Sequence, residues 1–372
     1  MREPSTLDLA AIAAELKFLK SFYIEKFYEL PGQQFRLKLN KSGEGQFNLM
    51  IIPGRLLSIA SIITQQDQPT NFSQAVRKRI ANSRIYDISL FNDDRILCIN
   101  IEKGEQHQYI IIEMFGKGNL IIADSDMVIT LAYMRHEFSD RKIFNGEKYI
   151  APKNKRITIS NIAEKNLVEE AVREASCIKG KNVMQALSTA INIGSLYLED
   201  AVIRAGIEPS SKLEEMSEEQ VKAIAESISS YSKFITAPEP RLYLENGVPV
   251  DYAICEIKKY SNMETKPFKL TYEALEKYYL SQPSQEAPVE SSRVKELESS
   301  IKKQKEIIEQ TAKEIEEFKN KGKLIYENMQ LVNSIINTAK SLKRFGKEDI
   351  EKAFGISVRE VNLKDKTITL DL

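Results

Sequence analysis

The chain has 372 residues, and its 53 basic residues balance its 53 acidic residues, so the formal net charge is zero. This length predicts two or three folding units, each large enough to bury a core. The charge balance excludes a protein that is basic throughout, so a nucleic-acid partner would have to contact local basic patches.

The cysteines and the N-terminal residues indicate the compartment. Cys98, Cys177 and Cys255 lie far apart without a CxxC spacing, which argues against a structural zinc site and is typical of a reducing environment. The first residues include acids where a secretory signal needs an apolar run, and no apolar run elsewhere reaches bilayer length. We therefore predict a cytoplasmic protein without a metal, a cofactor or a membrane partner.

A helix followed by antiparallel strands is predicted at the start of the chain. Apolar residues recur at helical spacing over 9–19, and Asp8 stands at the N-cap or in the first turn, where a carboxylate meets unpaired amides. Capping is the simplest role for Asp8. Alternating apolar residues at 35–40, 47–53 and 57–64 then predict consecutive strands.

A basic helix is predicted next, at 72–85. It carries Arg77, Lys78, Arg79 and Arg84, the densest basic cluster in the first half of the chain. These side chains could bind phosphates through charge and guanidinium hydrogen bonds. A solvated helix face is the simpler interpretation, because soluble helices normally present charges to water.

A meander of strands is predicted at 84–119, with a turn at Asn92 and Asp93. The adjacent pair Asp94 and Arg95 follows this turn, at the rim of the expected sheet. Taken alone, such a pair is more often a local salt bridge that fixes the hairpin than a binding site.

Glycines mark two further segments with exposed amides. The tight turn at 115–119 contains Lys117, which could contact an RNA phosphate or be solvated, but no helix follows it as in a nucleotide-binding P-loop. Gly194 at the turn and Gly206 at the end of the second helix predict a helical hairpin of the helix-hairpin-helix kind, which commonly exposes amides to a nucleic-acid backbone. A plain αα-hairpin explains both glycines equally well.

The segments that follow complete the predicted layout. A strand hairpin around Asn246 and Gly247, a short helix and a polar linker precede a long heptad pattern that starts at Val294. We expect the following domains: 1–160, a β-rich N-terminal domain; 161–235, a helix-hairpin-helix domain; 236–290, a hairpin, helix and linker that could pack back on the first domain; 291–340, a first coiled-coil helix; and 341–372, the start of a small α/β domain at its tip.

The heptad seam requires a partner helix. Its a and d positions are mostly apolar, with Lys and Glu between them, and no second comparable heptad run occurs in the chain. We interpret the chain as a truncated one, since it stops within the small domain at the tip of the coiled coil. We therefore expect the partner helix to lie downstream of residue 372. Failing that, two copies could form a homodimer through the seam.

Six motifs in this order resemble the NFACT family, the ribosome quality-control factors. The motifs are SxLD at 5–8, RKRI at 77–80, DR at 94–95, EMFGKGNLII at 113–122, NIGSLYLEDAVIRAGI at 192–207 and KGKLIYENMQLVNSII at 321–336. The resemblance covers essentially the whole chain. It implies an α+β multidomain protein whose N-terminal domain is similar to that of formamidopyrimidine-DNA glycosylases, followed by a helix-hairpin-helix domain and a coiled coil.

The resemblance also implies a function and its residues. Family members bind the large ribosomal subunit, with its ribosomal RNA and an obstructed peptidyl-tRNA, and recruit tRNA for template-free, alanine-type tailing of the stalled peptide. The family's tRNA-binding residues correspond to Asp8, Asp94 and Arg95, which should be solvent-accessible and near one another. Peptide-bond chemistry would remain with the ribosome, so no catalytic residue is expected.

Two other functions were weighed against this one. Glycosylase chemistry needs a proline amine directly after the removed methionine, but Arg2 is second and Pro4 comes too late. A scaffold or adhesion protein is the other alternative, although nothing in the sequence indicates secretion. His107 and His136 have no spacing that suggests a metal or a base.

Overall fold

The computed structural model describes residues 2–61, 68–154, 157–176, 181–211, 216–282, 289–341, 346–362 and 367–370. It divides into two compact units, Met1–Glu286 and Ala287–Leu372. Each unit is considered by itself. Cys177, one of the three cysteines, lies outside the described residues.

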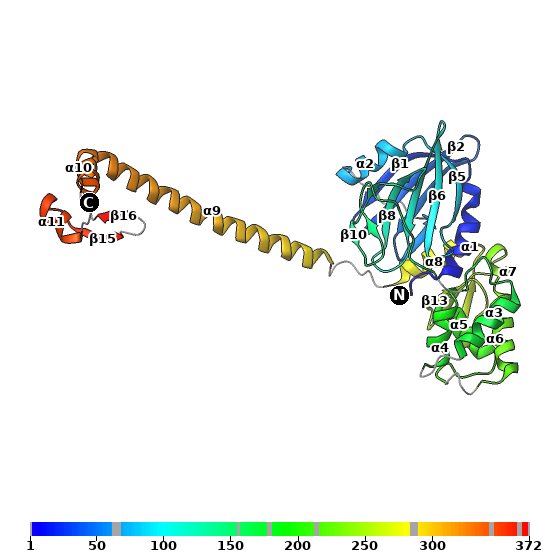
Figure 1. Ribbon diagram of the computed structural model, residues 1–372. Helices are drawn as coiled ribbons and strands as arrows, with labels where there is room; N and C mark the ends of the chain where they lie inside the picture. Colours follow the sequence, from blue (N-terminus) through cyan, green and yellow to red (C-terminus); the bar gives the residue numbers. More distant parts are fainter. Residues whose placement is uncertain are drawn as a thin grey trace. The chain divides into compact units, whose positions relative to one another are not determined.

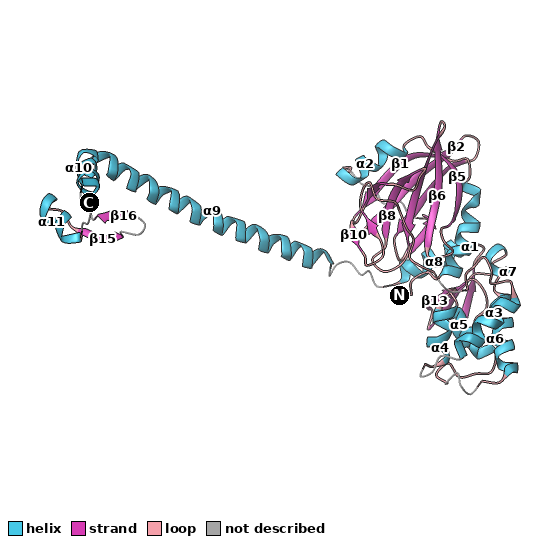
Figure 2. Ribbon diagram, in the orientation of Figure 1, coloured by secondary structure: helices cyan, strands magenta, loops and turns pink. Residues whose placement is uncertain are grey.

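A nine-stranded antiparallel sheet forms the β-rich part of the first unit (Figures 1 and 2), with the order β4-β3-β2-β1-β5-β6-β7-β8-β9. Its strands are β1 (Tyr23–Leu30), β2 (Gln34–Lys41), β3 (Gly45–Ile52), β4 (Leu56–Ile59), β5 (Arg84–Leu90), β6 (Ile96–Lys103), β7 (Gln106–Glu113), β8 (Asn119–Asp124) and β9 (Ile129–Ala132). Side chains from both halves of the sheet, such as Phe35 and Ile110, belong to one buried cluster. The two halves therefore pack against each other across a shared core.

The first helix joins this core to a second one. In α1 (Thr6–Glu15), Ser5 is the N-cap and Asp8 closes a capping box, as expected for a carboxylate in the first turn. Leu9 and Ile12 belong to the sheet core, whereas Leu7 and Ala11 belong to the helical core. Because opposite faces of α1 are buried in different cores, its N-terminus lies where the two parts of the unit meet.

The second core is built from helices. They are α3 (Lys165–Ser176), α4 (Val183–Ala190), α5 (Ser195–Arg204), α6 (Glu218–Ser230) and α7 (Lys233–Thr236). The predicted helical hairpin corresponds to α4 and α5, with Gly194 before α5 and Gly206 after it, both at positive φ. Its identification as a nucleic-acid-binding helix-hairpin-helix stays a prediction, as does the similarity of the β-rich part to glycosylases.

A second hairpin and a helix close the first unit. β12 (Arg241–Glu245) pairs with β13 (Val248–Ala253) and with β14 (Glu264–Pro267), and α8 (Thr271–Ser281) follows. Leu242 and Tyr252 are buried in the sheet core, while Tyr243 and Ala253 are buried in the helical core. The hairpin thus uses the two-residue period of its strands to cover both cores.

Two predicted boundaries are wrong. The basic helix α2 (Asn71–Ile80) ends before Asn82, whose φ of 63° is left-handed, so Arg84 begins β5 and does not lie on the helix. The strand predicted at 57–64 corresponds to β4, which ends at Ile59. Residues 62–64 of that prediction lie outside the described residues.

The second unit contains the long heptad helix. α9 (Val289–Glu327) and α10 (Met329–Ser341) are separate helices, and α10 turns away from the axis of α9 in Figure 1. The prediction of one continuous helix is therefore wrong at Asn328. Apolar seam residues of α9 are exposed, including Ile308 at 66% and Phe318 at 69%.

A small α/β domain ends the described chain. α11 (Lys347–Phe354) is followed by β15 (Val358–Asn362) and β16 (Thr367–Leu370), which form an antiparallel pair. Ile335 of α10 packs with Ile350 and Val358 in a small buried cluster. This arrangement confirms the one helix and two strands expected there.

Candidate functional site

A pocket of about 610 Å³ lies where the sheet, the helices and the N-terminus of the first unit meet. The N-terminal segment, defined here as residues 2–5, forms one wall; the turn between β5 and β6 and the start of α5 form others. Polar and aromatic groups dominate the lining, which includes Arg2, Glu3, Asp94, Arg95, Phe115, Phe138, Arg141, Asn192, Gly194 and Ser195.

Asp94 and Arg95 both line this pocket, but they are not paired through their side chains. Arg95 Nη1 lies 2.8 Å from Glu3 Oε2, and the Arg95 side chain is 32% exposed. Asp94 Oδ1 accepts hydrogen bonds from the Arg95 backbone amide at 2.8 Å and from Asn192 Nδ2 at 3.3 Å. The local salt bridge between Asp94 and Arg95 is therefore not formed. Each of the two side chains contacts a distant segment instead, Arg95 at Glu3 and Asp94 at Asn192.

Asp8 is fully buried, so the expectation that it is solvent-accessible is wrong. Asp8 Oδ2 accepts from Arg2 Nη1 at 2.7 Å and from the amide and hydroxyl of Ser5, each at 2.8 Å. Tyr252 donates to the same oxygen at 3.3 Å, and the hydroxyl of Tyr197 donates to Oδ1. Asp8 holds the N-terminal segment in place and reaches the pocket indirectly, through Arg2 and Ser5, which both line it.

Arg2 connects this buried network to the pocket wall. Its Nε lies 2.8 Å from Asp251 Oδ1, its Nη2 donates to the Tyr252 carbonyl at 2.7 Å, and its backbone amide donates to the Tyr278 hydroxyl at 2.9 Å. Burial alone would lower the pKa of Arg2, but Asp8 and Asp251 raise it well above its ordinary value. The guanidinium is therefore a permanent positive charge beside the pocket.

The tyrosines around Asp8 remain neutral donors. Burial, and then the negative charge of Asp8, raises the pKa of both Tyr197 and Tyr252 well above its ordinary value. Both hydroxyls can therefore donate hydrogen bonds to the carboxylate at any physiological pH.

Arg141, which lines the pocket, belongs to a buried ion pair. Arg141 Nη1 lies 2.5 Å from Glu113 Oε1, and the two side chains are only 3% and 5% exposed. The Tyr149 hydroxyl donates to the same glutamate oxygen at 3.1 Å, and the Arg141 guanidinium lies 4.4 Å from the centre of the Phe138 ring. Neither Arg2 nor Arg141 was assigned a role from the sequence, because neither lies in a motif that carries such a signal.

Gly194 allows the helical part to approach the N-terminal segment. Its φ is 107°, and a Cβ at this position would lie 2.4 Å from Ser5 Cβ, closer than atoms can approach. A glycine is therefore required where α5 begins, next to the residue that caps α1.

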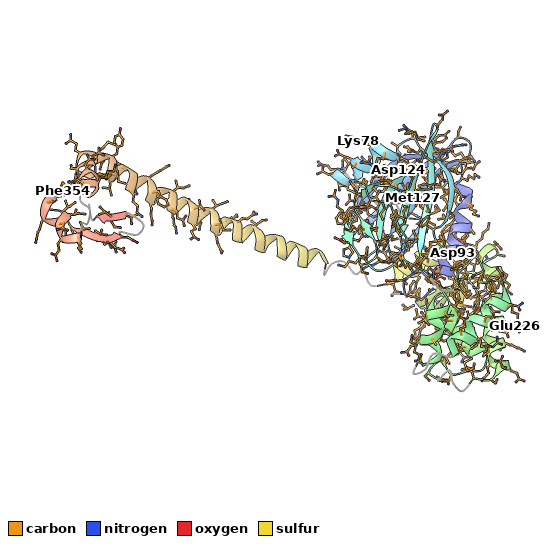
Figure 3. All side chains as sticks on the ribbon, viewed as in Figure 1. Lys78, Asp93, Asp124, Met127, Glu226 and Phe354 are labelled. Carbon is orange, nitrogen blue, oxygen red and sulfur yellow. The ribbon has the colours of Figure 1, made fainter. Side chains whose placement is uncertain are left out.

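Most of the predicted basic cluster is engaged in structural contacts. Arg77 Nε donates to the Phe27 carbonyl at 2.7 Å, and Arg79 donates to the carbonyls of Ala75 and Thr130 at 2.9 and 3.3 Å. The bonds to Phe27 and Thr130 fasten α2 to the sheet, while the bond to Ala75 lies within the helix. Lys78, labelled in Figure 3, is exposed on the same helix.

Arg84 and Lys117 lie at opposite ends of the sheet. Arg84 Nε donates to Glu102 Oε1 at 2.6 Å, at the end of β5 and β6 that is remote from Arg95. Lys117 is exposed in the turn between β7 and β8. This turn starts directly after Met114, whose backbone amide donates to the Arg95 carbonyl. Of the predicted phosphate contacts, Lys117 therefore lies at the pocket end of the sheet and Arg84 does not.

Other functional groups are sparse. Within the described ranges, no group of three or more His, Cys, Asp and Glu side chains could hold a metal ion, and no helix is long and apolar enough to cross a membrane. His107 packs against Tyr86, and His136 packs against Phe138. Cys98 and Cys255 are buried and free.

Comparison with known proteins gives matches along the chain. The family model described as "NFACT N-terminal and middle domains" matches residues 5–368. An archaeal Rqc2 homolog, aRqcH from Methanocaldococcus jannaschii, is 24% identical over 356 residues, which cover 92% of this chain and 52% of the relative. The human ribosome quality control complex subunit NEMF is also 24% identical, over 91% of this chain and 34% of the relative. The chain thus spans about half the length of the archaeal relative and a third of the human one.

A solved structure has a similar fold over most of the chain. The fibrinogen binding protein from Staphylococcus aureus superposes with a TM-score of 0.60 at 16% identity, covering 74% of this chain and 98% of that protein. At this identity the likeness concerns the fold alone. Because the family model matches nearly the whole sequence, the chain belongs to the NFACT family.

Proposed function

We propose that this chain is part of a ribosome quality-control factor. In this proposal the complete protein binds the large ribosomal subunit that carries an obstructed peptidyl-tRNA, and it positions tRNA for template-free, alanine-type tailing of the stalled peptide in the cytoplasm. The names of the archaeal and human relatives support the general role. The observation that carries the tRNA contact is the position of Asp94 and Arg95 on the wall of the 610 Å³ pocket.

The chemistry of the pocket suits RNA. Arg95 is partly exposed and engaged by a single carboxylate, Glu3, so its guanidinium can exchange that partner for a phosphate, to which it can donate two hydrogen bonds. Asp94 can accept a hydrogen bond from a 2′-hydroxyl or an exocyclic amine with the oxygen that Asn192 does not engage. The exposed ring of Phe138 offers a stacking surface for a base.

Asp8 contributes indirectly in this proposal. As a buried residue it cannot contact tRNA in this conformation, but it fixes Arg2 and hence the neighbouring Glu3, which engages Arg95. Lys117 and Lys78 are exposed cations that could add phosphate contacts. Peptide-bond formation stays with the ribosome, and the protein supplies binding energy and orientation without a nucleophile.

The proposal is tested by replacing both Asp94 and Arg95 with alanine in the full-length protein. We expect the tRNA that co-purifies with the protein to fall at least tenfold, and the salt dependence of tRNA binding to weaken by about one phosphate contact. The matched control replaces Glu25 and Lys38, an exposed ion pair on β1 and β2, with alanine. Undiminished tRNA in the double variant contradicts the proposal, and absence of RNA from the unaltered protein favours a scaffold.

A further inference from the structure

The turn that presents Asp94 and Arg95 has a left-handed backbone. Asn92 and Asp93 have φ values of 56° and 47°, and the Asp94 amide donates to the Phe91 carbonyl at 3.3 Å, as in the type I′ turns that are common in β-hairpins and that Asn and Asp tolerate. The hairpin can therefore form this turn by itself, and what fixes the position of the turn at the pocket must come from contacts with the rest of the unit. Asp93 is labelled in Figure 3, where it lies at the junction of the sheet with the helices.

Contacts from the helical part of the unit supply that support. Thr158 Oγ1 donates to Asp93 Oδ2 at 2.8 Å. Asn192 Nδ2 lies 3.4 Å from the Asp93 carbonyl oxygen and 3.3 Å from Asp94 Oδ1. Asn192 is buried, and its own Oδ1 accepts from Thr6 Oγ1 at 3.1 Å. The turn is therefore held by residues that lie 65 and 99 positions further along the chain.

We propose that Asp93 is a positioning residue, which fixes the Asp94 and Arg95 side chains at the pocket by anchoring their turn to Thr158. This inference rests on the proposed tRNA contact. Asp93 does not line the pocket itself, so its effect must act through its neighbours.

Substitutions can separate the anchor from the backbone conformation. Asp93→Gly keeps the left-handed turn accessible but removes the anchor, whereas Asp93→Asn tolerates the turn and retains an oxygen that accepts from Thr158. Thr158→Val removes the hydroxyl from the other end of the bond at nearly constant shape. If the anchor acts as proposed, Asp93→Gly and Thr158→Val should behave alike and Asp93→Asn should resemble the unaltered protein.

The experiment measures affinity for labelled, unfractionated tRNA and amide hydrogen exchange of residues 91–96 in the same full-length proteins. We expect Asp93→Gly and Thr158→Val each to weaken tRNA binding about tenfold and to speed exchange in the turn. The two changes combined should be no worse than Asp93→Gly alone, because both remove the same hydrogen bond. Near-ultraviolet circular dichroism checks that every variant is folded at the assay temperature.

The possible outcomes separate this inference from the function on which it rests. Exchange in the turn that does not change in either variant overturns the positioning role, whether or not tRNA binds. Additive effects of Asp93→Gly and Thr158→Val also overturn it, as does weak binding by Asp93→Asn. If the unaltered protein binds no tRNA while exchange still speeds up, the anchor is supported and the proposed function fails.

Discussion

Replacing Asp8 with alanine removes the centre of the buried network behind the pocket. The carboxylate accepts hydrogen bonds from Arg2, Ser5, Tyr197 and Tyr252, and its own side chain has no exposed surface. Without it, the Arg2 guanidinium, only 18% exposed, retains Asp251 as its one carboxylate partner in the described network. Breaking a buried ion pair costs about 3–5 kcal/mol when the other charge is left without compensation; because Arg2 keeps Asp251, we expect the low end of this range, about 3 kcal/mol.

This cost can be measured as a change in thermal stability. For domains of this size a loss of 1 kcal/mol lowers Tm by about 2–4 °C, so Asp8→Ala should lower the Tm of the first unit by roughly 10 °C. Differential scanning calorimetry of the full-length protein is the assay. As the control, Glu137→Ala removes a carboxylate from an exposed ion pair with Lys142 and should leave Tm unchanged.

A second variant tests whether the loss comes from the unpaired charge. Adding Arg2→Met and Asp251→Asn to Asp8→Ala removes the guanidinium together with both carboxylates that pair with it, so no charge of the network is left unpaired. Replacement of a buried ion pair by uncharged groups of similar size is often close to neutral, so this triple variant should recover most of the lost Tm. A Tm for Asp8→Ala within 2 °C of the unaltered protein, or a triple variant that is less stable still, refutes the reasoning.

Three other predictions follow from packing and burial. Gly194→Ala should strongly destabilise the first unit, because the new Cβ would lie 2.4 Å from Ser5 Cβ and the backbone at this position is left-handed. The urea midpoint of unfolding measures this loss, and an unchanged midpoint would show that Gly194 and Ser5 are less closely packed. Burial raises the pKa of the thiols of Cys98 and Cys255 to about 12. Both should therefore resist alkylation by iodoacetamide at pH 8 in the native protein and react in denaturant, which peptide mass spectrometry can measure. Rapid labelling of the native protein would contradict their burial. If two copies of this chain pair through the exposed seam, Ile308→Glu should abolish the dimer in analytical ultracentrifugation, whereas a dimer that persists must use another surface.

Local signals were sufficient to predict much of the first unit. Two-residue alternation located β2 and β3, and Asn246 with Gly247 located the β12–β13 hairpin, because these signals depend only on neighbouring residues. The end of α2 was harder to predict. Arg84 extends the basic pattern past Ile80 in the sequence, but it carries no information on the left-handed Asn82 that stops the helix.

The pocket depends on contacts that no local pattern encodes. Arg95 meets Glu3 across 92 positions of sequence, and Asp94 meets Asn192 across 98. The motifs indicated that Asp94 and Arg95 belong together with Asp8, but not that Asp8 lies beneath the surface. Its burial follows from the position of α1 between two cores, which is a property of the folded unit as a whole.

The burial of Asp8 changes what an effect of its substitution would mean. Under the proposed function Arg95 contacts tRNA directly, so its replacement should lower affinity while leaving Tm nearly unchanged, because its guanidinium is partly exposed and its bond to Glu3 is a surface ion pair. Replacement of a residue that holds the site in place should lower both the tRNA affinity and the Tm. If Asp8→Ala loses tRNA binding and stability together, and if the triple variant with Arg2→Met and Asp251→Asn restores stability without restoring binding, the function of Asp8 is to place Arg2 and the N-terminal segment beside Arg95.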